Sequence, residues 1–390
     1  MFVRSSAAEN QVGVAVDQAR SDPGTAERNH FPGSKPREFG ALAHPEDPSV
    51  LDRNRAIFDQ PERIAGYRFH GCDSAVDEQA VPHGFALKRG RLLRPLVMSN
   101  WPNLSDILLE PDAKVPVALI GAPLAAGSVT PGGCDQAPAK LRQTLRRIGR
   151  YDVEIGRELF TPIADQGDVP LAGLTIEEAT QPIQEAVGAA VASHGLTLLV
   201  GGNNAITRPA VLGLGRPLKT VGLLTLDAHF DMRSLDQGLS NGNPVRALME
   251  DGLPGANIAQ VGLASFANSA EMHHDALAAG NLVVTIESVR RQGIQRSIER
   301  AIRHLNGCDV IVVDCDIDVI DRAQMPAAPG ARPGGMAVWD FYWAVRKLAS
   351  EPRVRLIDLT EWDPPLDSTD LSALTAARWV AECLAGYELR

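Results

Sequence analysis

The chain has 390 residues, 44% of them hydrophobic and 22% charged, which is ordinary for a globular protein. Its net charge of −10 argues against a nucleic-acid-binding protein, which needs a basic face. No apolar run approaches the roughly 20 residues of a membrane-spanning helix, and the N-terminal segment lacks the apolar core of a secretion signal. The five cysteines are widely spaced and form no CxxC pair. We therefore expect a cytoplasmic protein with no membrane or nucleic-acid partner.

Residues 1–97 differ in character from the rest. This stretch is studded with Pro and Arg, as in FPGSKPREF, and has neither helical nor strand periodicity. Such a sequence cannot bury enough apolar surface to offset its ordering entropy. We predict a disordered extension over residues 1–97, or a segment upstream of a true start at Met98, and one catalytic domain over residues 98–390.

From residue 98 onward, short runs of Leu and β-branched residues alternate with amphipathic stretches, which is typical of βα units. Strands are predicted over residues 115–120, 196–200, 221–226, 258–261, 282–286, 310–316 and 354–359. Helices are predicted over residues 138–148, 176–194, 269–279, 294–305, 338–349 and 371–385. Because the strands are apolar on both faces, they predict an α/β fold, a three-layer α-β-α sandwich whose central sheet is mostly parallel.

Two predicted strands end in side chains that bind metal ions. Asp227, His229 and Asp231 follow one strand, and Asp316 and Asp318 end another. Alternate residues of a strand point to the same side, and ligands bind at the carboxyl ends of parallel strands. Carboxylates with one imidazole and no thiolate favour Mn²⁺ or Mg²⁺, and shared carboxylates can bridge two ions about 3.5–4 Å apart. We therefore predict a two-metal site that holds a hydroxide.

Each motif also has a purely structural interpretation. The first could be a strand end with a helix-capping aspartate, and the second could be a group of turn acids. Their occurrence after two separate apolar strands favours the metal site. Cys315 alternates away from its acidic neighbours and is expected in the core. Four histidines in polar, helical surroundings are expected at the surface: His194, His273, His274 and His304.

Several segments resemble the motifs of the arginase/agmatinase superfamily, the ureohydrolases. Three of them are DAHFD at 227–231, DIDVID at 316–321 and DLTEWDP at 358–364. GAPLAAGSVTPGGCDQAPAKLR at 121–142 and DQGDV at 165–169 are similar to the superfamily's glycine-rich loop and its D-x-G-D-V segment. All follow in the family's order. The resemblance implies an arginase-like fold, two Mn²⁺ ions and a homo-oligomer, either a trimer or a hexamer.

Within this superfamily the chain is most similar to the formimidoylglutamases. The similarity lies in DAHFDMR followed by LSNGNP, in NIAQVGLASFANSAE and in MPAAPGARPGGM. These enzymes of histidine degradation hydrolyse the C–N bond of N-formimino-L-glutamate to give L-glutamate and formamide. The implied partner is a small amidine substrate that carries carboxylates.

The resemblance implies a metal-binding role for each acid of the two motifs. Asp227 and Asp316 bridge the two ions, His229 and Asp318 complete one of them, and Asp231 helps to hold the other. The ions lower the pKa of a bridging water, and Asp318 helps to stabilise the tetrahedral intermediate. Asp227, His229 and Asp318 are therefore also expected to be catalytic.

Three further residues are implied in substrate binding. Glu361, also expected to be catalytic, pairs with the cationic nitrogens of the formimino group; the alternative is a capping acid before Pro364. Arg233 fits the DAHFD-x-R pattern, and its guanidinium can hold a carboxylate with two parallel hydrogen bonds; the alternative is an ion pair with Asp236. Asn241 stands where arginases carry a catalytic histidine, which argues against arginase activity, although Asn241 can hydrogen-bond the substrate.

The segment GGNNA at 201–205 departs from the superfamily's G-G-D-H-S. Asn204 replaces the histidine that ligates the first metal, and an amide oxygen binds manganese more weakly than imidazole does. Asn203 replaces an acid whose charge orients a ligand. We predict Asn204 as a metal ligand, with one ion held tightly and the other weakly.

The sequence leaves three functional hypotheses open. The first is a manganese-dependent formimidoylglutamase, and the second is another ureohydrolase that acts on a guanidino acid or on agmatine. The third is a non-catalytic metal-binding relative, which the loss of the Asp-His pair at Asn203 and Asn204 suggests. A phosphate-binding enzyme is disfavoured because no P-loop and no G-x-G-x-x-G motif is present.

Overall fold

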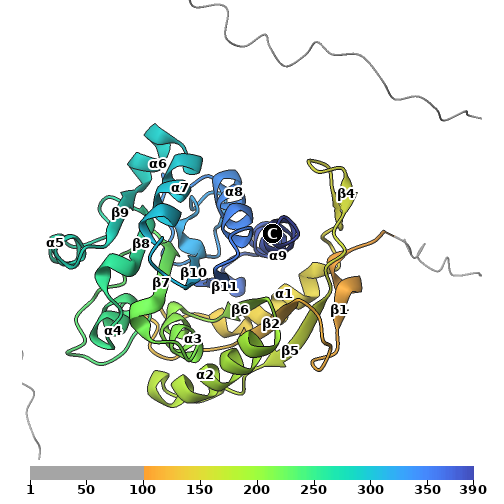
Figure 1. Ribbon diagram of the computed structural model, residues 1–390, viewed down its shortest axis with the longest axis horizontal. Coiled ribbons are helices and arrows are strands. Elements are labelled where there is room, and N and C mark those ends of the chain that lie inside the picture. The colour runs from red at the N-terminus through yellow and green to blue at the C-terminus, as the bar shows by residue number, and fades with distance from the viewer. Residues whose placement is uncertain (1–100) are drawn as a thin grey trace, which may run out of the picture. The chain divides into compact units, whose positions relative to one another are not determined.

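The computed structural model describes residues 101–390, so the predicted extension over residues 1–97, with its alternative start at Met98, lies outside the described residues. The described chain forms a nine-stranded sheet in the order β1-β5-β2-β6-β11-β10-β7-β8-β9. All neighbouring strands in it are parallel (Figure 1). The strands of this sheet are β1 (Leu108–Leu109), β2 (Val117–Ala122), β5 (Ile163–Asp168), β6 (Leu196–Gly201), β7 (Val221–Leu226), β8 (Ile258–Leu263), β9 (Leu282–Thr285), β10 (Val310–Asp316) and β11 (Val354–Thr360).

Helices cover both faces of the sheet, so the predicted three-layer α-β-α sandwich is confirmed (Figure 1). One face packs against α1 (Ala137–Leu145), α6 (Ile286–Gln292), α7 (Ile294–His304), α8 (Val338–Ala349) and α9 (Leu371–Tyr387). The other face packs against α2 (Ile176–Ser193), α3 (Thr207–Gly213), α4 (Pro244–Glu250) and α5 (Ala270–Ala279). Each face has its own cluster of buried apolar side chains.

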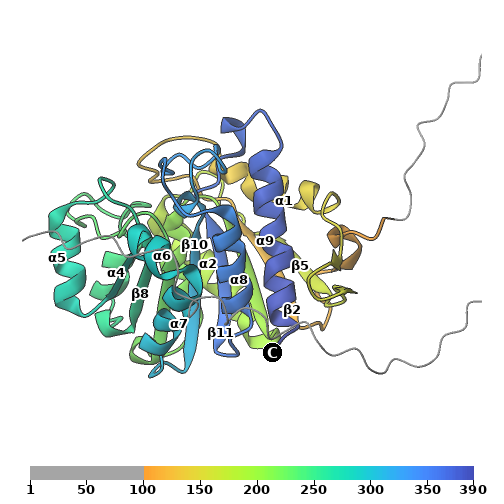
Figure 2. The same ribbon diagram turned by 90° about the horizontal axis from the view of Figure 1, so that it is seen from above.

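Three of the central strands are buried along their whole length. Every residue of β6, β7 and β10 is buried, because helices exclude water from both sides of a parallel sheet. The order of the strands brings β6, β11, β10 and β7 together as neighbours in the middle of the sheet. Figure 2 shows the loops that follow β10 and β11 along the upper edge of the view, whereas the C-terminus lies at the lower edge.

The observed elements match the prediction at most positions and differ at a few. All seven predicted strands and all six predicted helices are present, with ends that shift by up to three residues. The sequence pattern missed β5, whose segment IADQGD is half polar, and the short helices α3, α4 and α6. It also extended the strand at 282–286 into Ile286, where α6 begins because the Thr285 side chain accepts a hydrogen bond from the Ser288 amide.

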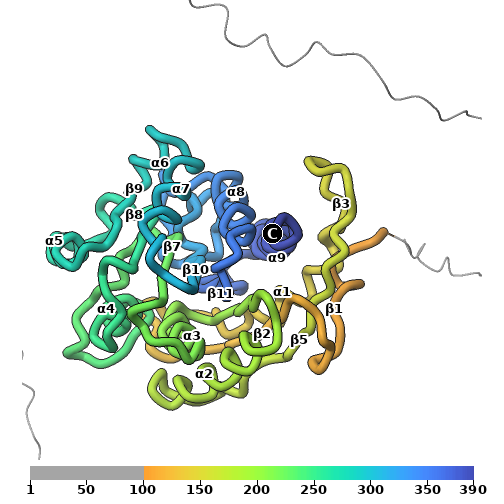
Figure 3. The backbone as a smooth tube through the Cα atoms, viewed as in Figure 1, coloured from red at the N-terminus to blue at the C-terminus, as the bar shows by residue number. Residues whose placement is uncertain are grey.

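Two further features complete the fold. A small antiparallel hairpin of β3 (Tyr151–Asp152) and β4 (Arg157–Glu158) extends away from the sheet (Figure 3). Among the described residues, we find no helix with the length and apolar character needed to cross a membrane.

The burial of one cysteine and three histidines tests where the sequence places these side chains. Cys315 is buried, as predicted, and His273 and His274 are exposed. The prediction for His194 was wrong, because its ring is buried and its Nδ1 lies 2.7 Å from the Val115 carbonyl oxygen. This hydrogen bond ties the end of α2 to the chain before β2, a long-range contact that the local polar sequence cannot reveal.

Candidate active site

The candidate site lies at the carboxyl edge of the sheet. The segments that follow β6, β7, β10 and β11 meet there because these four strands are neighbours and parallel. They carry the residues that the sequence singled out: Asn204 after β6, Asp227, His229 and Asp231 after β7, Asp316 and Asp318 at the end of β10, and Glu361 after β11.

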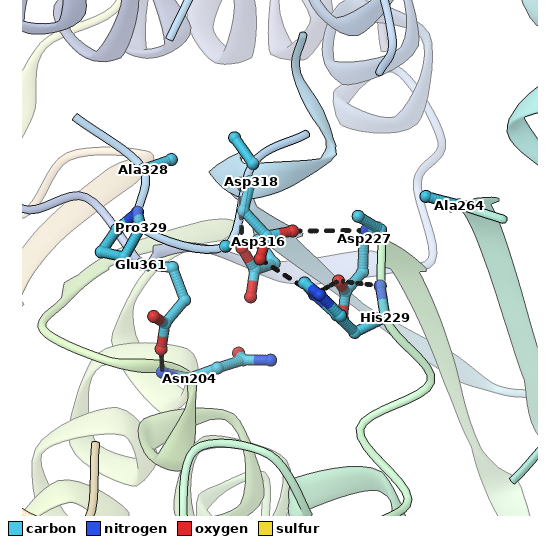
Figure 4. Close-up of polar contacts among 12 residues, drawn as sticks. Asn204, Asp227, His229, Ala264, Asp316, Asp318, Ala328, Pro329 and Glu361 are labelled. Atoms are coloured by element: carbon cyan, nitrogen blue, oxygen red, sulfur yellow. Dashed lines mark hydrogen bonds and ion pairs between the residues drawn. The ribbon is translucent and has the colours of Figure 1, made fainter. Parts of the chain in front are cut away.

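The structure gathers the five predicted acid and imidazole ligands into two overlapping groups. In each group, one ligand atom per residue lies within 4.8 Å of the others. The first group contains Asp227, His229 and Asp318, and the second contains Asp227, Asp231 and Asp316. Asp227 therefore belongs to both groups, whereas Asp316 belongs to the second. Figure 4 shows Asp227, His229, Asp316 and Asp318 converging from the two strand ends.

Backbone amides fix the orientation of these carboxylates. The amide of His229 donates to Asp227 Oδ1 at 2.6 Å, and the amide of Asp318 donates to Asp316 Oδ1 at 2.9 Å. Each bond joins an aspartate side chain to the backbone amide two residues further along, as in the turns that short acidic side chains form with their own backbone. The Ala228 amide donates to Asp318 Oδ1 at 3.3 Å and so links the ends of β7 and β10.

His229 is held between two carboxylates. Its Nδ1 lies 3.0 Å from Asp318 Oδ2 and 3.5 Å from Asp227 Oδ1. Burial alone lowers the pKa of His229, but these carboxylates outweigh burial and raise the pKa to about 11. Burial is the largest single influence on the pKa of Asp318 and raises it, but His229, the Ala228 amide and Asp316 together outweigh burial, so the net shift is downward.

The other carboxylates of the cluster are poorly compensated. Burial raises the pKa of Asp227 to about 7, and burial together with neighbouring acids raises the pKa of Asp231 and Asp316 well above the ordinary value. Asp227 Oδ2 is buried and has no hydrogen-bond partner among the described residues. Buried charges are normally paired or bind metal ions, so this donor set fits divalent cations.

Asn204 lies beside the cluster with its amide in a definite orientation. Its Nδ2 donates to Asp231 Oδ2 at 2.6 Å. Its Oδ1 accepts from the hydroxyls of Thr207 at 2.8 Å and Thr360 at 3.1 Å. The amide nitrogen, rather than the oxygen, thus faces the carboxylates in this structure. The adjacent Asn203 donates to the Ala126 carbonyl at 2.8 Å and points away from the cluster toward the glycine-rich loop.

Glu361 is held by two hydrogen bonds to one of its oxygens. Its Oε1 accepts from the Asn204 amide at 2.8 Å and from Asn241 Nδ2 at 2.8 Å; the first of these is drawn in Figure 4. Burial raises the pKa of Glu361 to about 7, although both hydrogen bonds oppose this shift. Asn241 in turn accepts a hydrogen bond from the Val129 amide of the glycine-rich loop at 2.8 Å. Within residues 101–390 the second oxygen of Glu361 has no such partner, so it can receive a ligand.

These residues line a cavity of about 470 Å³. Its walls include seven of the predicted site residues: His229, Asp231, Arg233, Asn241, Asp316, Asp318 and Glu361. Arg233 is exposed, and the structure shows no ion pair between it and Asp236, the alternative that the sequence allowed. Its side chain lies over Gly242, where a Cβ would stand 2.7 Å from Arg233 Cδ.

Backbone strain is concentrated at this cavity. Among the described residues, the non-glycine residues with positive φ are Asp231 (53°), Phe266 (64°) and Glu361 (60°), and all three line it. This conformation costs about 1–2 kcal/mol in residues with a Cβ. Strain of this kind accumulates at functional sites, because the surrounding structure holds a side chain where the chemistry requires it.

Comparison with known proteins agrees with this geometry. The family model described as "Arginase family" matches residues 115–386. The chain belongs to the arginase family.

Among arginase-family relatives, formimidoylglutamase of Bacillus subtilis is 30% identical over 284 residues, which cover 71% of this chain and 89% of the relative. The solved structure of formimidoylglutamase from the same species superimposes with a TM-score of 0.70 at 26% identity, covering 75% of this chain and 93% of that one. Human mitochondrial guanidino acid hydrolase is 27% identical over 272 residues, covering 68% of this chain and 77% of the relative.

Two residues of this arginase-family cavity were missed by sequence reasoning. Phe266 and Arg332 both line it, in the loops after β8 and β10. Both lie in segments that resembled formimidoylglutamases, but no individual signal marked either residue. The positive φ of Phe266, and the lack of an acidic partner for Arg332 among residues 101–390, become visible only in three dimensions.

Proposed function

We propose that this protein hydrolyses N-formimino-L-glutamate. One water is consumed: its oxygen forms a bond to the formimino carbon, the bond from that carbon to the α-nitrogen breaks, and formamide and L-glutamate leave. The observation that carries the proposal is a single cavity that combines the carboxylate–imidazole cluster, a buried carboxylate at Glu361 and an exposed guanidinium at Arg233. Similarity to formimidoylglutamases along the catalytic domain supports the choice of substrate.

Two Mn²⁺ ions are the proposed cofactor. Asp227, His229 and Asp318 are proposed to hold one ion, and Asp231 and Asp316 to hold the other with Asp227. Hard oxygen donors with one imidazole suit manganese. When bound, such ions lower the pKa of water and supply hydroxide near neutral pH.

Asn204 would be the sixth ligand, and Asp316 would help to hold both ions, as Asp227 would. Ligation through Asn204 Oδ1 requires the amide to turn over, because Nδ2 faces Asp231 and both threonine hydroxyls occupy Oδ1. That exchange costs hydrogen bonds, so we expect the ion in the second group to bind more weakly.

The chain's own residues orient the substrate. Glu361 has one oxygen fixed by Asn204 and Asn241, so its other oxygen can pair with the cationic formimino group and hold the reacting carbon against the cluster. The cation of the substrate also offsets the burial that raises the pKa of Glu361. Arg233 is proposed to bind a substrate carboxylate with two parallel hydrogen bonds.

A guanidino acid is the second candidate substrate. Its single carboxylate can pair with Arg233 and its guanidinium with Glu361, and guanidino acid hydrolases are among the relatives. Agmatine carries no carboxylate and leaves Arg233 without a partner. A non-catalytic metal-binding relative is the third possibility, and it predicts at most one ion per chain.

The deciding experiment is a substrate panel with the full chain and added Mn²⁺. We expect glutamate and formamide from N-formimino-L-glutamate, with two ions per chain by elemental analysis. Release of urea from a guanidino acid without turnover of formiminoglutamate supports the second candidate. No hydrolysis at millimolar Mn²⁺, with one ion or none per chain, supports the third.

Replacement of Arg233 tests the carboxylate contact. Arg233→Gln should lower kcat/KM for formiminoglutamate by about 10- to 100-fold, the usual effect of losing a hydrogen-bonded charge pair. The matched control is Arg303→Gln on α7, because this side chain is 64% exposed and its one acidic partner in the described part of the chain is Glu299. It lies near the start of β10, at the edge of the sheet opposite to the cavity.

We further propose that the protein is a homo-oligomer, a trimer or hexamer, in the cytoplasm. Family resemblance supports this assembly. Light scattering after size-exclusion chromatography tests it, and a monomer at micromolar concentration would contradict it.

A further inference from the structure

A second guanidinium lies in the same cavity as Arg233. Arg332 belongs to the loop after β10, and Arg233 belongs to the loop after β7. Since β7 and β10 are neighbouring parallel strands, both loops leave the sheet at the same edge. Both side chains are exposed, and neither makes an ion pair with an acidic side chain of residues 101–390.

The backbone holds Arg332 against the metal-binding cluster. The Arg332 guanidinium donates to the Gly330 carbonyl at 2.7 Å and to the Ala331 carbonyl at 3.3 Å. Gly330 itself touches the cluster, since a Cβ there would stand 2.0 Å from Asp318 Oδ2 and 3.1 Å from His229 Cε1. Arg332 therefore approaches the site from the side of Asp318 and His229.

Arg233 lies against a different loop. Its side chain lies over Gly242, and its backbone amide donates to the Gly242 carbonyl at 3.1 Å. Gly242 follows Asn241, which donates to Glu361. The two guanidinium groups thus belong to one cavity but lie on different loops, Arg332 on the loop that touches Asp318 and Arg233 on Gly242, the residue after Asn241.

We propose that Arg332 binds a second carboxylate of the substrate, so that the cavity selects dicarboxylates. This inference rests on the proposed function. One guanidinium binds one carboxylate through two parallel hydrogen bonds, so two arginines on different loops of one cavity match two carboxylates of one substrate. N-formimino-L-glutamate has an α-carboxylate and a γ-carboxylate, whereas a guanidino acid with one carboxylate leaves one arginine unpaired.

Substrates that each lack one carboxylate test the inference. N-formimino-4-aminobutyrate lacks the α-carboxylate, and N-formimino-L-norvaline has a methyl group in place of the γ-carboxylate. Wild type should prefer formiminoglutamate over each analogue by about 10- to 100-fold in kcat/KM. Arg332→Gln should lose the preference over one analogue and keep the preference over the other. Arg233→Gln should keep the preference that Arg332→Gln loses, and lose the one that Arg332→Gln keeps. Arg303→Gln should keep both preferences.

Two results would overturn the inference. One is an Arg332→Gln variant that retains both preferences, or whose kcat/KM falls equally for all three substrates. The other is an Arg332→Gln variant that loses the same preference as Arg233→Gln. Circular dichroism and the metal content of each variant establish that it is folded and loaded.

A binding measurement separates this inference from the proposed function. In calorimetry with the Mn²⁺-loaded chain, glutarate, which has two carboxylates, should bind about 10-fold or more tightly than butyrate, which has one. Arg332→Gln and Arg233→Gln should each remove this advantage. If the advantage is present but formiminoglutamate is not hydrolysed, the proposed function fails and the dicarboxylate site stands. If formiminoglutamate is hydrolysed but glutarate has no advantage, the dicarboxylate site fails alone.

Discussion

Gly330→Ala should disrupt the metal-binding cluster without replacing any of its proposed ligands. A Cβ at this position would stand 2.0 Å from Asp318 Oδ2 and 2.9 Å from Asp318 Cγ. Ordinary contact begins near 3.4 Å, so the loop and the carboxylate must separate by about 1.4 Å. Either the loop after β10 retreats, or Asp318 turns and loses its contacts with His229 and the Ala228 amide.

The expected magnitude follows from that displacement. Overpacking of a buried site costs about 1–3 kcal/mol of unfolding free energy. A shift of about 1 Å at a catalytic group lowers the rate by roughly 100-fold. We therefore expect Gly330→Ala to bind Mn²⁺ more weakly, with a kcat/KM for formiminoglutamate about 100-fold below wild type.

The matched control is Gly307→Ala, between α7 and β10. A Cβ there meets no atom within 4 Å, and its φ lies outside the left-handed range. Calorimetric titration with Mn²⁺, elemental analysis and steady-state kinetics on both variants measure the effect. Equal metal affinity and equal kcat/KM in the two variants would refute the placement of Gly330 against Asp318.

Asn204, Phe266 and Cys134 offer further tests around the cavity. Asn204→Asp puts a carboxylate where Nδ2 lies 2.6 Å from Asp231 Oδ2, so two carboxylates repel each other in the metal-free protein. Its metal-free Tm should therefore fall, and Mn²⁺ should raise its Tm more than that of wild type. Equal Mn²⁺-induced shifts of the two proteins in scanning fluorimetry would contradict this. Phe266→Gly should give a higher Tm than Phe266→Ala, because glycine has no Cβ and adopts the positive φ of 64° without strain. The reverse order of Tm values would contradict this. Burial raises the pKa of Cys134 to about 12, so its thiol stays protonated. Iodoacetamide should therefore leave Cys134 unmodified below about pH 10 until urea unfolds the protein. Labelling without urea, detected by peptide mass spectrometry, would contradict the burial of this thiol.

The fold could be predicted where one local property decides the structure. β6, β7 and β10 are buried on both faces, and their mostly apolar sequences predict this burial. β5 has the opposite character, since IADQGD carries two aspartates that pair with Arg142 of α1. That pairing depends on tertiary contacts, so a pattern of neighbours along the chain could not reveal the strand.

The site could be predicted to the extent that strand ends determine it. Asp227, His229 and Asp318 meet because two neighbouring parallel strands end there, and alternation sets which side chains face each other. Phe266 and Arg332 lie in long loops instead. A loop has no repeating geometry, so their positions in the cavity depend on packing that the sequence pattern does not encode.

Asn204 shows why residue identity alone leaves a ligand's role open. An amide has a donor end and an acceptor end, and three other elements decide which end faces the metal-binding acids: Thr207 in α3, Thr360 in β11 and Asp231 after β7. The two hydroxyls satisfy the acceptor end, so turning the amide toward a metal ion leaves them to find other partners. The carboxylates that Asn204 faces must then supply most of the affinity of the second group. A carboxylate at position 204 has two acceptor oxygens and does not face this choice, which is why Asn204→Asp should increase the stabilisation by Mn²⁺ rather than abolish it.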